Sequence, residues 1–508
     1  MYYLTQTQIQ MRKGKYDMKL TRRIATLLLA LIMVLSVSAT VFADGETYTI
    51  TITGTSEGHT YEAYQIFTGD MADDGTLSNV VWGTGVTADG QTALGNAADK
   101  AESLTDVAAA EAFSKEVAAY LTSPAATATV AEGATTCALT GLTPGYYLIK
   151  TSAVPTDSNS QPEVNGVYSQ YIMHVVYVNA DLEIKIKASV PPVGKTADDT
   201  VVSIGQTVTF TLTSALPEYV AAYETYTLIF KDALPVQGQQ SLEFEAVTSV
   251  TVGSKTLTKD VDYTVSCLGN GELTITIENA RSASINGQAG DVVTAIYTAK
   301  VADTAVIGDE GFKNGVLVQY SNNPYAQGYG MTTTNEVTLY TWSIPVYKYI
   351  EGTGGAKAPL EGAGFTLYAD EACTEAITVT KDASVTDSNL YRVDPDSTTE
   401  EITTDATGKF VIGGLAEGTY YLKETATPAG YNTADVVAIT VAEDGTLTIP
   451  GEDGAAETVT EVAVLNQAGT TLPTTGGMGT TMIYIVGGIL ALAAVVLLIV
   501  KRRMSTAE

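Results

Sequence analysis

The sequence predicts a mainly β protein made of tandem β-sandwiches, with one amphipathic helix in its N-terminal domain. Apolar residues alternate with threonine in short segments such as 48–52 and 208–212, which is the period of half-buried strands. Glycine and Asp-Gly turn signals separate these segments at short intervals. The 508 residues leave room for about three domains of ~100–200 residues each. Short strands with frequent turns favour sandwiches over a parallel α/β sheet.

The N-terminal segment is typical of a secretory signal peptide. Basic residues precede a mostly apolar stretch over residues 24–37, and Val-Phe-Ala follows at 41–43. We expect residues 1–43 to be removed by cleavage after Ala43, so that the mature chain begins at Asp44. Because the residues before Met18 are unlike a signal peptide, Met11 and Met18 are candidate start positions.

Composition excludes several classes of function. The net charge of -30 and a pI near 4.3 argue against nucleic-acid binding, which requires a basic face. Such acidity suits an outer-surface protein, and equally any secreted bacterial protein. Three widely spaced cysteines make no disulfide framework, and His59 and His174 are too few for a histidine-based triad or a multi-histidine zinc site. The acidic residues within 70–74, which are Asp70, Asp73 and Asp74, indicate an exposed turn rather than a calcium loop. We expect no metal and no cofactor.

The chain divides into three β units. The first, residues 44–190, contains strands at 48–52, 145–150 and 171–178, and a helix-like apolar spacing from Ala97 to Tyr120. Two prolines at 191–192 mark the boundary to a middle unit, residues 191–340. A third unit covers residues 341–468, and residues 469–508 form the C-terminal segment. The helix is expected to pack on the sheet of its own domain.

The C-terminal segment contains three features in a fixed order. The first is a pentapeptide of Leu472, Pro473, Thr474, Thr475 and Gly476. An apolar run over residues 482–500 is long enough to cross a membrane, and the basic residues 501–503 would stay on the cytoplasmic side. Pro473 biases the backbone before it toward the extended form that an enzyme groove can read.

This order resembles the cell-wall sorting signal of Gram-positive surface proteins. The resemblance implies a sortase that cleaves between Thr475 and Gly476 and transfers the Thr475 carbonyl to an amine. The alternative is a permanent C-terminal anchor with an accidental motif, which leaves unexplained why the soluble part ends at this pentapeptide.

The third unit resembles a Cna-B-type domain over its whole length. The resemblance rests on residues 359–368 (Pro-Leu-Glu-Gly-Ala-Gly-Phe-Thr-Leu-Tyr), 418–424 (Gly-Thr-Tyr-Tyr-Leu-Lys-Glu) and 428–431 (Pro-Ala-Gly-Tyr). It implies tandem immunoglobulin-like (Cna-type) β-sandwiches. It also implies an isopeptide bond between Lys348 and Asn466, with Glu424 as the assisting acid. The alternative is three surface residues without a bond.

The implied chemistry requires these residue types. A lysine attacks only as a neutral amine, and burial lowers its pKa. A buried carboxyl is driven toward its protonated form, in which it can polarise the asparagine carbonyl and pass a proton to departing ammonia. Aromatic and aliphatic neighbours in the sequence, such as Tyr347 and Leu465, would supply the apolar walls.

The middle unit contains three segments that matter here: 194–196 (Gly-Lys-Thr), 230–235 (Phe-Lys-Asp-Ala-Leu-Pro) and 314–324 (Asn-Gly-Val-Leu-Val-Gln-Tyr-Ser-Asn-Asn-Pro). They resemble the middle domain of Gram-positive major pilins. The resemblance implies a second bond, formed by Lys195, Asp232 and Asn314, and its least specific part is the short Asp-Ala-Leu-Pro motif. The first unit has Thr151 at the position where a glutamate would be wanted, so we expect no internal bond there.

At the end of the first unit, the same resemblance implies a lysine that accepts the acyl group of the next subunit. The Tyr-Pro-Lys motif of many pilins is absent, and residues 186–191 (Ile-Lys-Ala-Ser-Val-Pro) occupy its place. Lys187 is the preferred acceptor, Lys185 is the alternative, and a solvated strand edge is the plainer interpretation.

Taken together, the resemblance implies a structural backbone subunit of a covalent surface pilus, and not an enzyme acting on other molecules. Its implied partners are a sortase, identical subunits, peptidoglycan, accessory pilins and a host receptor. A wall-anchored adhesin that does not polymerise is the alternative. A wall-anchored enzyme would need a catalytic constellation that the sequence does not contain.

Overall fold

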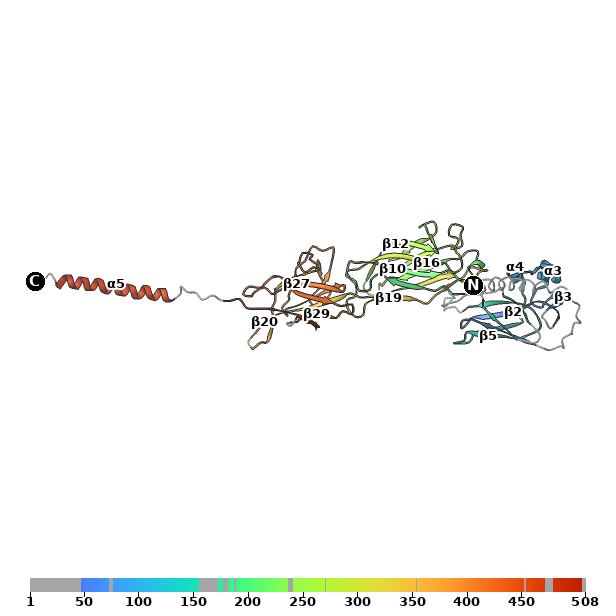
Figure 1. Cartoon of the computed structure of the whole chain (residues 1–508), viewed down its shortest axis with the longest axis horizontal. Helices are drawn as coiled ribbons and strands as arrows, with labels where there is room; N and C mark the ends of the chain where they lie inside the picture. Colours follow the sequence, from blue (N-terminus) through green and yellow to red (C-terminus); the bar gives the residue numbers. More distant parts are fainter. Residues whose placement is uncertain are drawn as a thin grey trace, which may run out of the picture. The chain divides into compact units, whose positions relative to one another are not determined.

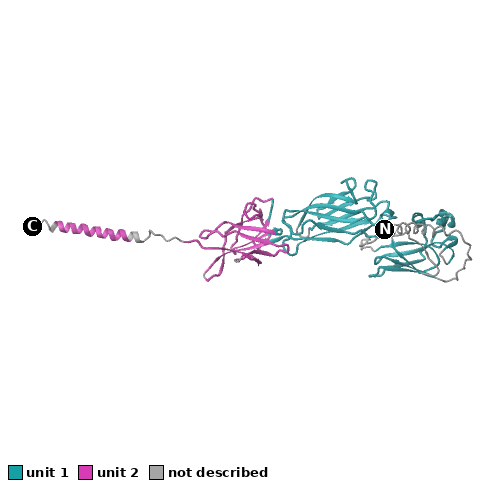
Figure 2. Ribbon diagram, viewed as in Figure 1, with its two compact units in different colours: residues 1–343, 393–395, 413–417 teal, residues 344–392, 396–412, 418–508 magenta. Residues whose placement is uncertain are grey.

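A computed structural model describes most of the chain and divides it into two compact units (Figure 2). Unit 1 comprises residues 1–343, 393–395 and 413–417, and unit 2 comprises 344–392, 396–412 and 418–508. The described residues are 47–72, 76–154, 172–176, 181–186, 189–235, 241–269, 271–352, 354–451, 454–470 and 478–504. The expected signal peptide, Lys187 and the pentapeptide 472–476 lie outside these ranges.

The N-terminal part of unit 1 is a two-sheet sandwich with short helices. One sheet has the order β5-β1-β8, and the other has the order β3-β2-β6-β7 with β4 beside β2. Apolar residues of the two sheets, among them Ile50, Ile52, Tyr61 and Tyr147, form one buried cluster. The strands are β1 (Tyr48–Thr53), β2 (Thr60–Met71), β3 (Leu77–Trp82), β4 (Ala126–Thr129), β5 (Thr136–Leu142), β6 (Gly145–Ala153), β7 (Ile172–Val176) and β8 (Leu182–Lys185).

The expectation of a single helix over residues 97–120 was wrong. The segment contains α3 (Ala97–Ser103), α4 (Val107–Val117) and the short 3-10 helix η2 (Ala118–Tyr120), and α2 (Ala88–Leu94) precedes them (Figure 1). The break after α3 has a local cause, because Leu104 leaves helical geometry and the Asp106 carboxylate accepts a hydrogen bond from the Ala109 backbone N–H at 2.8 Å. A capping side chain at this position starts a new helix.

The helices do pack on the sheet of their own domain, as expected. Phe113 and Val117 of α4 are buried in one cluster with Ile66 and Phe67 of β2. The rings of Phe67 and Phe113 are stacked with their centroids 5.6 Å apart. The amphipathic pattern therefore identified the buried face correctly, although it did not reveal the caps that divide the segment.

The middle part of unit 1 is a second sandwich. Its sheets have the orders β13-β12-β16-β10-β9 and β14-β15-β11-β17-β18, with β19 beside β17. The strands are β9 (Gly194–Ala197), β10 (Thr207–Ala215), β11 (Leu228–Ala233), β12 (Leu242–Val252), β13 (Lys255–Thr256), β14 (Thr264–Cys267), β15 (Glu272–Ile277), β16 (Val292–Val301), β17 (Phe312–Ser321), β18 (Tyr329–Met331) and β19 (Asn335–Leu339), with the 3-10 helix η3 (Val220–Ala222) after β10.

Unit 2 contains a third sandwich, and its first and last strands lie side by side. One sheet has the order β21-β20-β26-β24-β23 with β31 beside β20, and the other has the order β25-β22-β27-β28-β29-β30. β20 and β31 run parallel, with Lys348 opposite Val464. The strands are β20 (Trp342–Glu351), β21 (Lys357–Pro359), β22 (Gly364–Tyr368), β23 (Val379–Lys381), β24 (Leu390–Val393), β25 (Ile402–Thr403), β26 (Lys409–Leu415), β27 (Gly418–Ala426), β28 (Val437–Val441), β29 (Leu447–Pro450), β30 (Ala456–Val459) and β31 (Val462–Asn466).

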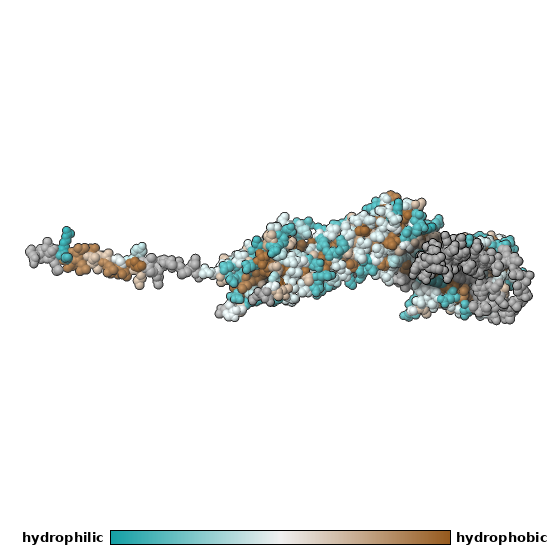
Figure 3. All heavy atoms as spheres, in the orientation of Figure 1, coloured by the Kyte–Doolittle hydropathy of each residue, from teal (hydrophilic) through white to brown (hydrophobic). Residues whose placement is uncertain are grey.

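The C-terminal helix α5 (Met478–Met504) contains a segment suited to a membrane. Residues Met482–Arg502 have a mean hydropathy of 3.0 and are long and apolar enough to span a bilayer. Apolar side chains cover this helix on the face seen in Figure 3. The basic residues follow at its C-terminal end, as the sequence predicted.

A tight turn beside β20 offers a test of how closely this sandwich is packed. Gly408 has φ +74°, and a Cβ there would strike the carbonyl oxygen of Lys348. Gly362 has nearly the same φ, +75°, but has open space around it. The Gly362→Ala variant should lose about 1 kcal/mol of unfolding free energy through left-handed strain alone. The Gly408→Ala variant should lose about 3 kcal/mol, since the clash adds to that strain.

Amide hydrogen exchange of β20 would measure both losses. Equal protection in the two variants would contradict the close packing inferred at Gly408.

Candidate functional site

Six polar residues of unlike type occupy core positions in the middle and C-terminal sandwiches. Each lies on the inward-facing side of a strand whose other inward residues are apolar: Lys348 continues the row of Ile344 and Val346, and Asn466 continues that of Val462 and Val464. The six, with their exposed fractions, are Lys195 (7%), Asp232 (1%), Asn314 (0%), Lys348 (0%), Glu424 (3%) and Asn466 (1%). The structure brings them together in two groups of three.

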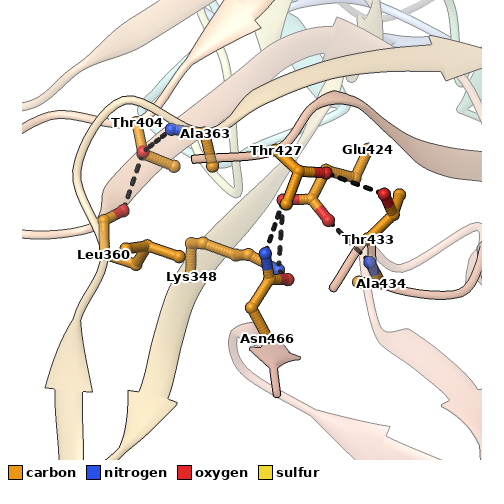
Figure 4. A network of polar contacts seen from close by, with 9 residues as sticks. All are labelled: Lys348, Leu360, Ala363, Thr404, Glu424, Thr427, Thr433, Ala434 and Asn466. Carbon is orange, nitrogen blue, oxygen red and sulfur yellow. Dashed lines mark hydrogen bonds and ion pairs between the residues drawn. The ribbon is translucent and has the colours of Figure 1, made fainter. Parts of the chain in front are cut away.

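The C-terminal group joins both sheets of its sandwich. Lys348 of β20 and Asn466 of β31 come from neighbouring parallel strands, and Glu424 of β27 reaches them from the facing sheet. Figure 4 shows the three side chains pointing toward one another. The Lys348 amine donates a hydrogen bond to Asn466 Oδ1, and its Nζ lies 3.7 Å from Glu424 Oε1. The Asn466 amide donates to the same Oε1 at 2.9 Å.

The Glu424 carboxylate thus contacts both the Lys348 amine and the Asn466 amide. The other oxygen of Glu424 accepts a hydrogen bond from the Ala434 backbone N–H at 2.6 Å, which fixes the orientation of the carboxylate. The centroid of the Phe365 ring lies 5.5 Å from Lys348 Nζ, and this ring forms part of the apolar wall. Burial lowers the pKa of Lys348 to about 8, although the neighbouring Glu424 carboxylate acts in the opposite direction.

The middle group is arranged across the sandwich. Lys195 of β9 belongs to one sheet, whereas Asp232 of β11 and Asn314 of β17 lie on adjacent antiparallel strands of the other. The Lys195 amine forms a salt bridge with Asp232 Oδ2, and both side chains are fully buried. The Lys195 backbone N–H also donates to the Asn335 side chain at 2.9 Å, which holds β9 in place.

Burial shifts the pKa values of this pair toward the uncharged forms. It lowers the pKa of Lys195 to about 8, against the opposing effect of Asp232. It also raises the pKa of Asp232, although Lys195 and the Tyr297 hydroxyl act in the opposite direction. A neutral amine is the form in which lysine can attack a carbonyl carbon, and a protonated carboxyl is the form that can donate a proton.

A fourth residue of the middle group, Tyr297 of β16, was not identified from the sequence. Its hydroxyl lies 3.0 Å from Lys195 Nζ, 2.7 Å from Asn314 Nδ2 and 3.2 Å from Asp232 Oδ2. Its inward position in the alternating strand 292–301 was the one sequence feature that marked it, and a tyrosine at such a position is usually an ordinary core residue. The ring stacks on Phe210 with centroids 5.0 Å apart.

The N-terminal sandwich has the same parallel pairing of its first and last strands, but with other residues at the pairing positions. β1 and β8 run parallel, as β20 and β31 do, but Ile52 faces Ile184 in this pair. Thr151 is buried in β6, at the position where an assisting glutamate would be needed for an internal bond. Lys185, the alternative acceptor, ends β8 with an exposed side chain.

If Asn466, which the resemblance implies as the bonding partner of Lys348, is removed, the buried amine should make the stability depend on pH. In an Asn466→Ala variant, Lys348 remains an amine with a pKa near 8 when folded and an ordinary pKa of 10.5 when unfolded. Between these values the unfolded chain binds more protons, so the free energy of unfolding of unit 2 should rise as pH increases from about 8 to 10.5.

Urea unfolding over this pH range would measure the effect, with the double variant Lys348→Met, Asn466→Ala as the control that has no amine to titrate. Identical pH profiles for the two variants would mean that Lys348 is not desolvated in the folded state.

Comparisons with known proteins agree on the fold. Residues 350–454 match the sequence model of the family described as SpaA, prealbumin-like fold domain. No curated protein matches the chain. The T6 backbone pilin of serotype M6 Streptococcus pyogenes is 18% identical, with a TM-score of 0.52 over 86% of this chain and 94% of its own.

The full-length major pilin SpaD from Corynebacterium diphtheriae is also 18% identical, with a TM-score of 0.50 over 85% of this chain and 100% of its own. These likenesses confirm the predicted class of mainly β, tandem β-sandwiches. The chain has the fold of these two pilins, and the matched residues 350–454 lie within its third sandwich.

Proposed function

We propose that the chain is the backbone subunit of a covalently polymerised surface pilus, and that amide bonds between side chains stabilise its sandwiches. The observation that carries the proposal is the burial of two lysines, each in contact with a carboxylate and within a group that contains an asparagine. A buried ammonium is costly, and a buried ion pair is weak support for stability. Conversion of each lysine to a neutral amide removes that cost.

The proposed reaction is an exchange of amides. A neutral lysine Nζ attacks the asparagine Cγ, the Nζ–Cγ bond forms, the Cγ–Nδ2 bond breaks, and one ammonia leaves. In the C-terminal group, Glu424 contacts both nitrogens and can move the proton from the attacking amine to the departing one. Lys348 with Asn466, and Lys195 with Asn314, are the proposed pairs.

Assembly between subunits uses one group from the end of the first β unit and one from the C-terminal pentapeptide. Thr475 supplies the acyl group through a sortase, and Lys187 of the next subunit supplies the amine. Because these groups lie on different parts of one subunit, the contact is head to tail and builds a fibre rather than a closed oligomer. The apolar helix α5 suits a membrane stop before cleavage, and the last subunit would be joined to peptidoglycan. The proposed location is therefore the wall of a Gram-positive cell.

The relatives support this function by their described roles. The T6 protein is described as a backbone pilin and SpaD as a major pilin. Adhesion to a host receptor, attachment of accessory pilins and the absence of activity on other molecules remain parts of the proposal.

The three cysteines are free in the structure, so disulfides do not strengthen the sandwiches.

Intact mass would test the internal bonds. Each bond releases one ammonia, so the mature protein should be lighter than its sequence by about 34 Da, or about 17 Da per bond. The Lys348→Ala and Lys195→Ala variants each keep only one of the two bonds, so each should be lighter than its own sequence by about 17 Da. A full-length mass with no deficit would contradict both proposed pairs.

Wall extracts boiled in detergent would test polymerisation. Wild-type cells should give a ladder of multimers, because amide bonds survive these conditions, and Lys187→Ala should reduce it to monomer. The matched control is Lys185→Ala, which removes an exposed lysine two residues away and should leave the ladder intact. The reverse result would make Lys185 the acceptor, and a wild-type extract without a ladder would favour the non-polymerising adhesin.

A further inference from the structure

The hydroxyl of Tyr297 is the centre of the middle group. It accepts hydrogen bonds from the Lys195 amine at 3.0 Å and from the Asn314 amide at 2.7 Å, and it donates to Asp232 Oδ2 at 3.2 Å. The tyrosine is fully buried. The hydroxyl therefore touches the attacking nitrogen, the departing nitrogen and the carboxylate at once.

The two groups differ in how the carboxylate reaches the asparagine. In the C-terminal group, the Asn466 amide donates directly to Glu424. In the middle group, the Asn314 amide nitrogen donates to the tyrosine, and the hydroxyl connects it to Asp232. Within the described part of the chain, Asp232 Oδ1 and Asn314 Oδ1 are buried without hydrogen-bond partners. The aspartate, with its shorter side chain, thus has a tyrosine hydroxyl between it and the departing amide.

We propose that Tyr297 is a catalytic residue of the middle bond, whose hydroxyl transfers a proton from the attacking amine to the departing amide nitrogen. This inference rests on the proposed function, in which Lys195 and Asn314 become joined. The Nζ–Cγ bond forms first, and in the resulting tetrahedral intermediate Nδ2 is a basic amine nitrogen; the hydroxyl then gives its proton to Nδ2 and receives one from Nζ. The Cγ–Nδ2 bond then breaks and ammonia leaves, so Tyr297 ends unchanged and no oxidant or reductant takes part.

The surroundings of the hydroxyl suit a relay that stays neutral between transfers. Burial, and then the charge of Asp232, raise the pKa of Tyr297 well above its usual value. The hydroxyl therefore keeps its proton until the tetrahedral intermediate supplies another. A positioned proton donor and acceptor typically accelerates such a step by about 10²–10⁴-fold.

The direct test compares two conservative variants, each lacking one buried hydroxyl. Tyr297→Phe removes the proposed relay. Tyr320→Phe is the matched control, because Tyr320 is a buried tyrosine of β17 whose hydroxyl has no hydrogen-bond partner among the residues that the structure describes. The full mature chain is produced by cell-free synthesis, and intact mass and branched peptides are followed over time.

In Tyr297→Phe, the bond between Lys195 and Asn314 should form about 100-fold more slowly or not at all. The bond between Lys348 and Asn466 should form at the wild-type rate, which also shows that the chain has folded there. Both bonds should form normally in Tyr320→Phe. A wild-type rate for the middle bond in Tyr297→Phe would overturn the role of Tyr297, as would equal slowing in the control.

A second measurement does not depend on the folding of a variant. Replacement of tyrosine by 3-fluorotyrosine throughout the chain makes the phenol more acidic and leaves the ring in place. It should change the rate of the middle bond and leave that of the C-terminal bond unchanged. An unchanged middle rate would overturn the relay. Failure of the wild-type chain to join Lys195 to Asn314 would instead overturn the proposed function at this group.

Discussion

The structure depends on the burial of a lysine amine between an apolar wall and a carboxylate. An ammonium in such a place is destabilising unless it is paired, and pairing it seldom recovers the cost of desolvation. Lys348 and Lys195 nevertheless occupy inward positions in sandwiches whose other inward residues are largely apolar. The proposed amide bond would resolve this conflict, because it would remove the charge and keep the side chain in the core. The same burial that makes the lysine costly also favours its reactive neutral form.

The two groups place their proposed bonds differently with respect to the sheets. Lys348 and Asn466 connect the first and last strands of one sheet, so a pull on the two ends of this sandwich would load the bond before it could separate β20 from β31. Lys195 and Asn314 connect two facing sheets instead. The N-terminal sandwich has the same parallel pairing of β1 with β8, but isoleucines face each other there. The pair of proposed bonding residues therefore has no counterpart at these two positions.

Much of the fold could be predicted, because alternation reveals which residues face inward. The members of both groups were expected instead from the resemblance to Cna-B-type domains and major pilins. The structure places Lys348 in the core row of Ile344 and Val346. The helical segment was misread, since amphipathic spacing does not show where the Asp106 cap starts a new helix. Tyr297 was missed because a tyrosine in a core row looks ordinary. The contacts of its hydroxyl come from residues on other strands, and local sequence does not predict which residues meet across two sheets.

The central claim is that these side chains are covalently joined, and peptide mapping of the mature protein tests it most directly. After reduction, denaturation and protease digestion, tandem mass spectrometry should find branched peptides. One should link the segment containing Lys348 to that containing Asn466, and another should link Lys195 to Asn314. Each should be lighter by one ammonia, about 17 Da, than the sum of its two linear peptides. Recovery of all four residues only in unmodified linear peptides would contradict the account.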